Sequence, residues 1–306
     1  MLYQLSYAAT AFTLKNASSL AIYKKCENLS MCDKQGVWET RQVSLISDKI
    51  LMIHTMNVTT LEQFFKENPQ VALGFSGGTD SSYLLYAGLR YGAKVKAYFI
   101  KGAFQPEFEL HDAYRIAQKI GAEITVLEVD VLQNAQVVAN PPDRCYFCKT
   151  AVFGIICERA KADGLPLVID GTNASDDVAD RPGMKALHEL QVRSPLRECG
   201  ITKDMVRRLS KKAGLFTWNK PAYACLATRI PAGQAITKEL LQRIENAEAA
   251  LFALKFSDFR VRVMGDAAKL QFPQDQLKKA FQQRKKIVNA IKPYFPAVLL
   301  DLEERG

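Results

Sequence analysis

Residues 71–82 read VALGFSGGTDSS, an apolar segment followed by a loop of serine and glycine. The segment 71–75 predicts a buried strand, and the residues after Asp80 predict a helix. Glycines let the backbone turn tightly, and the start of the helix adds unpaired N–H donors and a positive dipole end. The stretch therefore predicts a phosphate-binding loop, with an ordinary glycine-rich turn as the alternative.

The aspartate at position 80 sets the chemistry of this loop. The loop lacks the Gly-Lys-Ser/Thr ending of a Walker A motif, and a carboxylate repels a phosphate unless Mg²⁺ lies between them. We therefore expect Asp80 to bind Mg²⁺. The candidate phosphate ligands are Ser76, Gly77, Gly78, Asp80 and Ser81.

Strands and helices alternate along the chain after this loop. The expected strands are 95–100, 124–130 and 165–170, with helices at 82–92, near 107–120 and after residue 149. The alternation predicts an α/β fold, a parallel sheet with helices on both faces. Ligands bind at the carboxyl ends of such strands. The candidate site segments are therefore the loop after residue 75, segment 143–149 and loop 170–183.

The pattern changes near residue 229, where proline and glycine interrupt it. The expected elements are then a helix near 237–255, strands at 259–264 and 267–272, a basic helix at 274–292 and a strand at 297–302. They predict a small α+β domain. The predicted parts are an N-terminal extension at 1–55 (poorly ordered, or added by too early a start codon), an α/β domain at 56–228, and a C-terminal domain at 229–306 for substrate binding or oligomerisation.

Composition limits the class of protein. The 306 residues carry a net charge of +9, which favours anionic partners. The basic segment KDMVRRLSKK (203–212) is expected to be a solvated helix face, so the charge permits RNA binding without arguing for it. No apolar run of about 18 residues predicts a membrane span. The seven cysteines do not suggest a disulfide framework in so long a chain, which indicates a reducing cytoplasm.

Two of those cysteines, Cys145 and Cys148, form the motif DRCYFCK (143–149). Such a pair occurs in half of a zinc site, in a redox dithiol, in part of an iron–sulfur site, or as two buried thiols. The pair alone leaves these four interpretations open.

Polar residues gather in the loop that follows the strand at 165–170. Thr172 and Asn173 are suited to hold a nucleotide, and Asp177 and Arg181 to bind Mg²⁺ or phosphate. The alternative is that such residues only cap and turn the chain.

Three arginines are candidates for binding an anionic substrate. Arg260 and Arg262 alternate along one expected strand and therefore face the same side, and Arg229 follows Cys225. Guanidinium groups pair with phosphate and carboxylate through two hydrogen bonds. Solvated or salt-bridged arginines are the alternative.

The stretch SGGTDS after a strand resembles the PP-loop of the ATP pyrophosphatases, which cleave ATP between the α and β phosphates and transfer AMP to a carbonyl oxygen. Within that superfamily the chain is similar to the LarE family, over about residues 57–303. The similar stretches are DGTNASDDVADRPGMKAL (170–187), SPLRECGITKDMVRRLSKKAGL (194–215), NKPAYACLATRIPAG (219–233) and FRVRVMGDAAKLQFP (259–273).

The resemblance implies an ATP-dependent sulfur transferase of nickel-pincer cofactor synthesis. Its substrate would be pyridinium-3,5-biscarboxylic acid mononucleotide, whose carboxylates are adenylated by ATP and then converted to thiocarboxylates. Adenylation is needed because carboxylate oxygen is a poor leaving group, whereas thiolate and sulfide are strong nucleophiles. The resemblance also suggests a homo-oligomer. The sequence does not identify the sulfur donor, and we expect neither a membrane nor nucleic acid as a partner.

The family divides by cysteine content, and members with three cysteines hold a 4Fe-4S cluster. This chain has Cys145, Cys148 and Cys225, which the resemblance makes catalytic residues and cluster ligands. Three thiolates can hold three irons of a cubane, whereas structural zinc requires four ligands and a dithiol leaves Cys225 unexplained. Zinc, a dithiol and inert thiols stay as alternatives. In the family pattern, Glu248 corresponds to an acid near the substrate phosphate or metal.

The chain departs from the family pattern at a few positions. Lys269 and Gln271 replace an arginine and a glutamate, and Thr228 stands where serine is usual, which alters the charge of the substrate site. Two further functions fit the motifs. A tRNA thiolase can combine such a loop with a CxxC and an iron–sulfur cluster, but no added RNA-binding domain is recognisable. A non-catalytic nucleotide-binding regulator is the third, and the intact loop argues against it.

Overall fold

The structure, a computed structural model, describes residues 60–176 and 182–303. The predicted extension at 1–55 and the candidate ligands Asp177 and Arg181 lie outside the described residues. Within those ranges, no helix combines the length and the apolar character that a membrane crossing requires.

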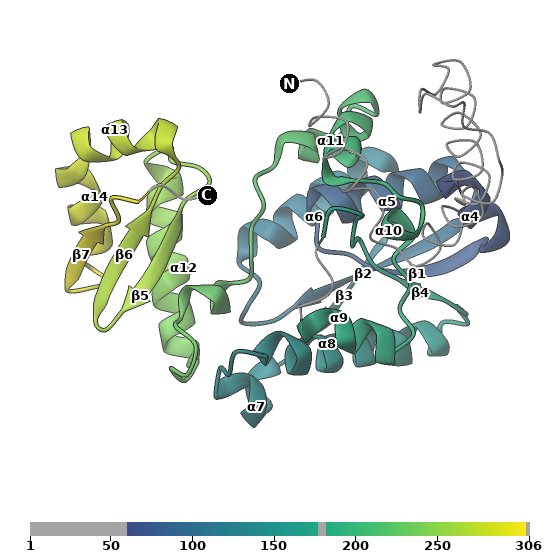
Figure 1. The fold of residues 1–306 in the computed structure, drawn as a ribbon, viewed down its shortest axis with the longest axis horizontal. Helices are drawn as coiled ribbons and strands as arrows, with labels where there is room; N and C mark the ends of the chain where they lie inside the picture. Colours follow the sequence, from purple (N-terminus) through teal and green to yellow (C-terminus); the bar gives the residue numbers. More distant parts are fainter. Residues whose placement is uncertain (1–59, 177–181, 304–306) are drawn as a thin grey trace, which may run out of the picture. The chain divides into compact units, whose positions relative to one another are not determined.

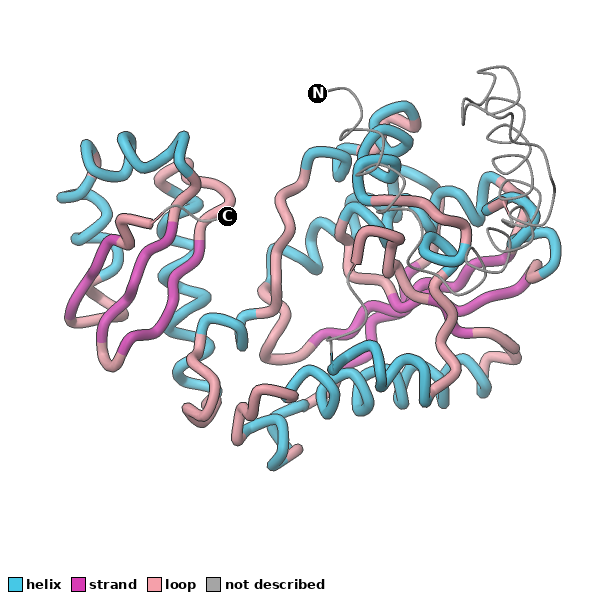
Figure 2. Tube along the Cα trace, viewed as in Figure 1, coloured by secondary structure: helices cyan, strands magenta, loops and turns pink. Residues whose placement is uncertain are grey.

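The strand before the phosphate loop is an inner strand of a four-stranded parallel sheet with the order β3-β2-β1-β4 (Figures 1 and 2). The strands are β1 (Gln70–Gly74), β2 (Lys94–Lys101), β3 (Ile124–Glu128) and β4 (Val168–Ile169). Leu73 of β1 pairs with Ala97 on one side and with Ile169 on the other. The predicted α/β fold is therefore confirmed.

Helices cover both faces of this sheet, as the sequence predicts. Leu73 packs in one core with α5 (Thr79–Arg90) and α6 (Glu107–Ile120), whereas Ala72 packs in a second core with α8 (Arg144–Ala162) (Figure 1). Successive side chains point to opposite faces because the strand period is two. The other elements of this part are α4 (Leu61–Glu67), η1 (Val131–Gln133), α7 (Ala135–Val138), α9 (Pro182–Glu189), α10 (Pro195–Glu198), α11 (Lys203–Lys212), η2 (Phe216–Asn219) and η3 (Leu226–Arg229).

The helix next to the CxxC motif starts earlier than predicted. The sequence predicts a helix after residue 149, but α8 begins at Arg144, directly after Asp143 at its N-cap. Cys145 and Cys148 therefore lie in the first turns of α8. Residues three apart on a helix share a face, so the two thiols are neighbours.

A second sheet follows in the C-terminal part. It contains β5 (Arg260–Met264), β6 (Ala267–Gln271) and β7 (Ala297–Leu300), with β5 antiparallel and β7 parallel to β6. Its helices are α12 (Lys238–Ala253), α13 (Gln274–Gln282) and α14 (Arg284–Ile291). The single basic helix predicted at 274–292 is wrong, because the chain breaks it at Gln283 into α13 and α14, and none of residues 282–286 around the break is buried. The domain boundary at residue 229 stays a prediction.

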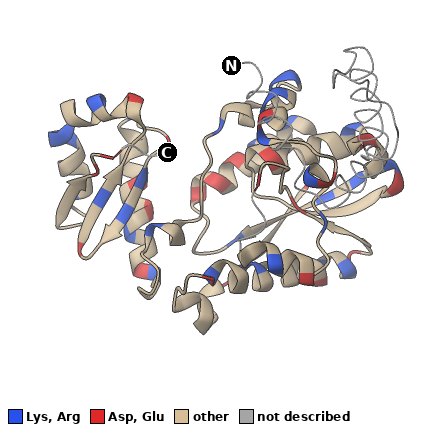
Figure 3. Ribbon diagram, viewed as in Figure 1, with Lys and Arg blue, Asp and Glu red and all other residues tan. Residues whose placement is uncertain are grey.

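Basic residues are spread over most elements (Figure 3). In α11, Arg208, Lys211 and Lys212 are exposed, as predicted for a solvated face. Lys203 differs, because its ammonium group pairs with Asp80 of the phosphate loop. One end of the basic helix therefore belongs to the candidate site.

Candidate functional site

The phosphate loop forms a tight turn between β1 and α5. Gly77 has a φ of +68°, and a Cβ at this position would lie 3.1 Å from the backbone of Ala113. Both features exclude larger residues. The hydroxyl oxygens of Ser76 and Ser81 lie 3.1 Å apart, and Ser76 accepts a hydrogen bond from the N–H of Gly78. Loop and helix start thus form one unit that can offer N–H groups to a phosphate.

Two lysines reach this loop from distant parts of the sequence. Lys203 pairs with Asp80, and Lys220 Nζ lies 2.9 Å from Asp112 and 3.5 Å from the carbonyl oxygen of Gly77. Sequence reasoning missed both. Lys203 stands in the helix that was interpreted as solvated. Lys220 stands in the NKPAYAC stretch, in which a role was predicted for the cysteine alone. Both ammonium groups lie where they could meet a bound phosphate.

The loop after β4 lies against the phosphate loop. A Cβ at Gly171 would lie 3.0 Å from a backbone nitrogen in the first turn of α5, and the Asn173 amide lies 3.5 Å from the Asp80 carboxylate. The hydroxyl of Thr172 donates instead to Asp170 within its own turn. Of the two predicted nucleotide ligands in this loop, Asn173 contacts the phosphate loop and the Thr172 hydroxyl is engaged locally.

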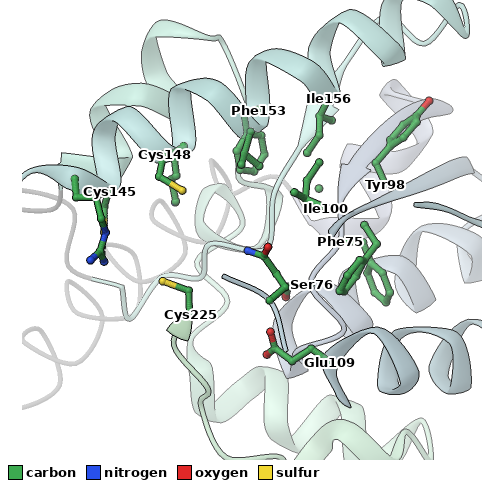
Figure 4. Close-up of a pocket in the computed structure, with 16 residues that line it drawn as sticks. Phe75, Ser76, Tyr98, Ile100, Glu109, Cys145, Cys148, Phe153, Ile156 and Cys225 are labelled. Atoms are coloured by element: carbon green, nitrogen blue, oxygen red, sulfur yellow. The ribbon is translucent and has the colours of Figure 1, made fainter. Parts of the chain in front are cut away.

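Cys145, Cys148 and Cys225 line one cavity of about 320 Å³, together with Ser76 at the start of the phosphate loop (Figure 4). We call it the sulfur cavity. Much of its wall is apolar and includes Phe75, Tyr98, Ile100, Phe153 and Ile156. The fold thus brings the CxxC pair and the distant third cysteine to the carboxyl edge of β1, next to the phosphate loop.

The three thiols influence one another electrostatically. Burial, and then the negative charges of Cys225 and Cys145, raise the pKa of Cys148 to about 12. Burial also raises the pKa of Cys225, although the guanidinium group of Arg144 opposes the rise. A bound cation would relieve this repulsion and favour the thiolates. In the described ranges, no group of three or more His, Cys, Asp or Glu side chains is arranged around a single metal ion.

A buried ion pair anchors the segment that carries Cys225. Arg229 Nε and Nη2 lie 2.8 and 3.2 Å from the two carboxylate oxygens of Glu248, and Arg229 Nη1 donates to the carbonyl oxygen of Ala224. Tyr223 donates its hydroxyl to Glu248, and burial, followed by the Glu248 charge, holds the pKa of Tyr223 well above its usual range. Arg229 and Glu248 thus bind each other. Their contact with substrate stays a prediction.

The arginines of β5 hold the same segment. Arg260 Nη2 donates to the carbonyl oxygen of Ala222, and Arg262 Nη1 donates to that of Thr228 at 2.9 Å. Arg260 is buried, whereas Arg262 is exposed. The face of β5 that was predicted to bind substrate therefore also holds the Cys225 segment, and its substrate role stays a prediction.

Asp301 contacts the two residues of β6 that were interpreted as departures from the family pattern. Lys269 Nζ lies 2.8 Å from this carboxylate, and Gln271 donates to it at 2.8 Å while accepting from Arg262. Hydrogen bonds from Lys269 and then Gln271 hold the pKa of Asp301 below its usual range. A carboxylate that directly follows β7 thus lies beside Lys269 and Gln271 of β6.

One acid of the sulfur cavity was missed from the sequence. Glu109 lies in the first turn of α6 and lines the cavity with Ser76 and Cys225 (Figure 4). Burial raises the pKa of Glu109 to about 7, although Lys220 and Arg229 lower it. Acidic residues are common in the first turn of any helix, so the sequence carries no signal for this placement.

Comparisons with known proteins give several relatives. No protein-family model matches the chain. An uncharacterised protein of Synechocystis is 38% identical over 251 residues, which cover 79% of this chain and 92% of that protein. The pyridinium-3,5-bisthiocarboxylic acid mononucleotide synthase of Lactiplantibacillus plantarum is 30% identical over 220 residues, 71% of this chain and 80% of the synthase. A tRNA-specific 2-thiouridylase of Thermotoga neapolitana is 25% identical over 194 residues, 49% of this chain and 54% of that protein.

Proposed function

This chain belongs to the LarE family of ATP-dependent sulfur transferases, and from that premise we propose that it converts the carboxylates of pyridinium-3,5-biscarboxylic acid mononucleotide to thiocarboxylates. The observation that carries the proposal is the sulfur cavity, in which the phosphate loop and three cysteines meet. An activated carbonyl and a sulfur nucleophile could react there with water largely excluded.

The first step is adenylation of a substrate carboxylate. A carboxylate oxygen attacks the α-phosphorus of ATP, and pyrophosphate leaves. The N–H groups of the phosphate loop and of the start of α5 hold the phosphates. Asp80 would hold Mg²⁺, which neutralises phosphate charge. Lys203 would then release Asp80, and its ammonium group, like that of Lys220, would pair with the departing pyrophosphate.

Lys220→Met is expected to lower kcat/KM for ATP, measured by pyrophosphate release, about 10- to 100-fold. A hydrogen bond to a charged group contributes about 1.5–3 kcal/mol, and methionine keeps the length of the side chain without the charge. The matched control is Lys212→Met at the exposed end of α11, expected to change the rate by less than about twofold. An unchanged rate in Lys220→Met would exclude this lysine from the nucleotide site.

The second step transfers sulfur to the acyl adenylate and releases AMP. We assign Cys145, Cys148 and Cys225 as ligands of a 4Fe-4S cluster, because the three thiols line one cavity and their charges interact. Ligands of a cubane bind different irons, so they do not need to meet at one point. When bound, the cluster would supply an iron without a protein ligand, suited to hold a sulfide. Arg144 would keep the ligands together, since it donates to the sulfur of Cys145 and to the carbonyl oxygen of Ala227.

The direct test is to incubate anaerobically purified protein with ATP, Mg²⁺, sulfide and the pyridinium substrate. We expect pyrophosphate, AMP and a product in which sulfur has replaced oxygen, identified by mass spectrometry. Absence of substrate-dependent pyrophosphate release would refute the proposal. The cellular sulfur donor and the homo-oligomeric state stay predictions.

A tRNA thiolase is the second candidate, because about half of this chain is similar to a tRNA-specific 2-thiouridylase. This alternative predicts pyrophosphate release that depends on tRNA instead of the pyridinium nucleotide. It also predicts binding of tRNA that weakens steeply with salt. A deletion strain that lacks one thiolated nucleoside in its tRNA would decide in its favour.

A further inference from the structure

Glu109 lies on the wall of the sulfur cavity without a bonded partner. In the ranges that the structure describes, its carboxylate makes no hydrogen bond and no ion pair, while Ser76 and Cys225 line the same cavity (Figure 4). An acid that is neither paired nor fully solvated lowers the stability of the fold. Its position in the cavity therefore points to a functional role.

The charged groups that face Glu109 are engaged elsewhere. The cations each have another acidic partner: Lys220 with Asp112, Arg229 with Glu248, and Lys101 with Glu107. The neutral hydroxyl of Tyr223 also faces this site and donates to Glu248. Burial therefore outweighs attraction, and the pKa of Glu109 rises to about 7. A group with this pKa can accept and release a proton near neutral pH.

We propose that Glu109 is the general base of the sulfur-transfer step and accepts the proton of a hydrosulfide nucleophile as the C–S bond forms. The inference rests on the proposed function. HS⁻ attacks the carbonyl carbon of the acyl adenylate, the bond from that carbon to the AMP oxygen breaks, and AMP leaves with the electron pair. The S–H proton passes to Glu109, and the thiocarboxylate anion remains. No group is oxidised or reduced.

Removal of this proton decides which group leaves the tetrahedral intermediate. Sulfur that keeps its proton can depart again as HS⁻ and return the acyl adenylate. Sulfur that has lost its proton is a much poorer leaving group, so the intermediate expels AMP instead. A base in the same cavity as Ser76 and Cys225 therefore makes the transfer productive.

The test separates adenylation from sulfur transfer in the Glu109→Gln variant, which keeps the shape of the side chain and removes the base. Pyrophosphate release with the pyridinium substrate is expected to stay within about twofold of wild type. Thiocarboxylate formation in a single turnover with sodium sulfide is expected to fall about 100-fold, as is typical when a general base is lost. The matched control is Glu123→Gln, the same chemical change at an exposed position just after α6, expected to leave both rates unchanged.

The pH dependence gives a second readout. The ratio of wild-type to Glu109→Gln transfer rates removes the titration of hydrosulfide itself, which affects both proteins equally. Because the unprotonated carboxylate is the base, this ratio is expected to rise with pH and to level off above about 7. Infrared difference spectra should show a protonated carboxyl group in wild type below that pH, absent from the variant.

Three outcomes would overturn the inference. A ratio that does not change with pH excludes a titrating base at Glu109. An equal loss of adenylation and transfer in Glu109→Gln would make Glu109 a residue that positions substrate or supports the fold. The third outcome is failure of the proposed function itself. Wild-type protein would then release no pyrophosphate with the pyridinium substrate, which overturns both the proposed function and the role of Glu109.

Discussion

Cys225→Ser is expected to lower thiocarboxylate formation at least about 1,000-fold while adenylation continues, because the sulfur chemistry loses its third thiolate and the phosphate loop is untouched. Serine oxygen is a poor ligand for iron, so the two cysteines of α8 would be left to hold the cluster alone. The variant therefore separates the two halves of the proposed reaction.

Metal and sulfide analysis of anaerobically purified protein checks this prediction. Wild type is expected to contain about four iron and four sulfide per chain, and Cys225→Ser close to none. Cys199→Ser is the control, because Cys199 is partly buried at the end of α10 and is not part of the sulfur cavity. Wild type with stoichiometric zinc would refute the cluster, and a Cys225→Ser variant that keeps its iron would refute Cys225 as one of its ligands.

Glu248→Gln is expected to lower the free energy of unfolding by about 3–5 kcal/mol, the largest stability effect that we predict. The substitution keeps the size of the side chain but leaves the charge of Arg229 buried without a counter-ion. In a structured region of this size, the loss corresponds to a fall in Tm of roughly 10 °C. Because the ion pair anchors the Cys225 segment, iron content should fall as well.

Denaturant unfolding measures this loss of stability, and two further variants serve as comparisons. Glu245→Gln makes the same change at a half-buried position of α12, where the amide oxygen can still accept the hydrogen bond from the Glu107 N–H, and is expected to alter stability by less than about 0.5 kcal/mol. Arg229→Met combined with Glu248→Gln removes both charges, keeps an oxygen that can accept from Tyr223 or Val261, and should recover much of the stability lost in Glu248→Gln alone. Equal stability of wild type and Glu248→Gln would show that the buried pair is not what holds this segment.

The parallel sheet could be predicted because its signals are local. Residues 71–75 are apolar throughout, since β1 is buried on both faces, and the glycines that follow suit a turn such as that at Gly77. Local signals failed at element ends. The start of α8 was placed after the CxxC, and the break in the helix at 274–292 was missed, because both depend on packing and capping that the pattern does not show.

The candidate site was only partly predictable. Its cysteines and loop residues stand in recognisable motifs, so sequence reasoning found them. Glu109, Lys203 and Lys220 stand in ordinary helix starts, basic faces and loops. Their position at the phosphate loop or the sulfur cavity depends on partners far away in the chain, such as Asp80 for Lys203.

By itself, the sequence determined the alternation of strands and helices, the phosphate loop after β1, and the motifs that carry Cys145, Cys148 and Cys225. Each of these depends on residues that are neighbours in the chain, so periodicity and spacing reveal it. Only the tertiary structure decided that the three cysteines share a cavity with Glu109 and that Arg229 binds Glu248. These contacts join distant segments, and the distances between such segments are set by how sheet, helices and loops pack together.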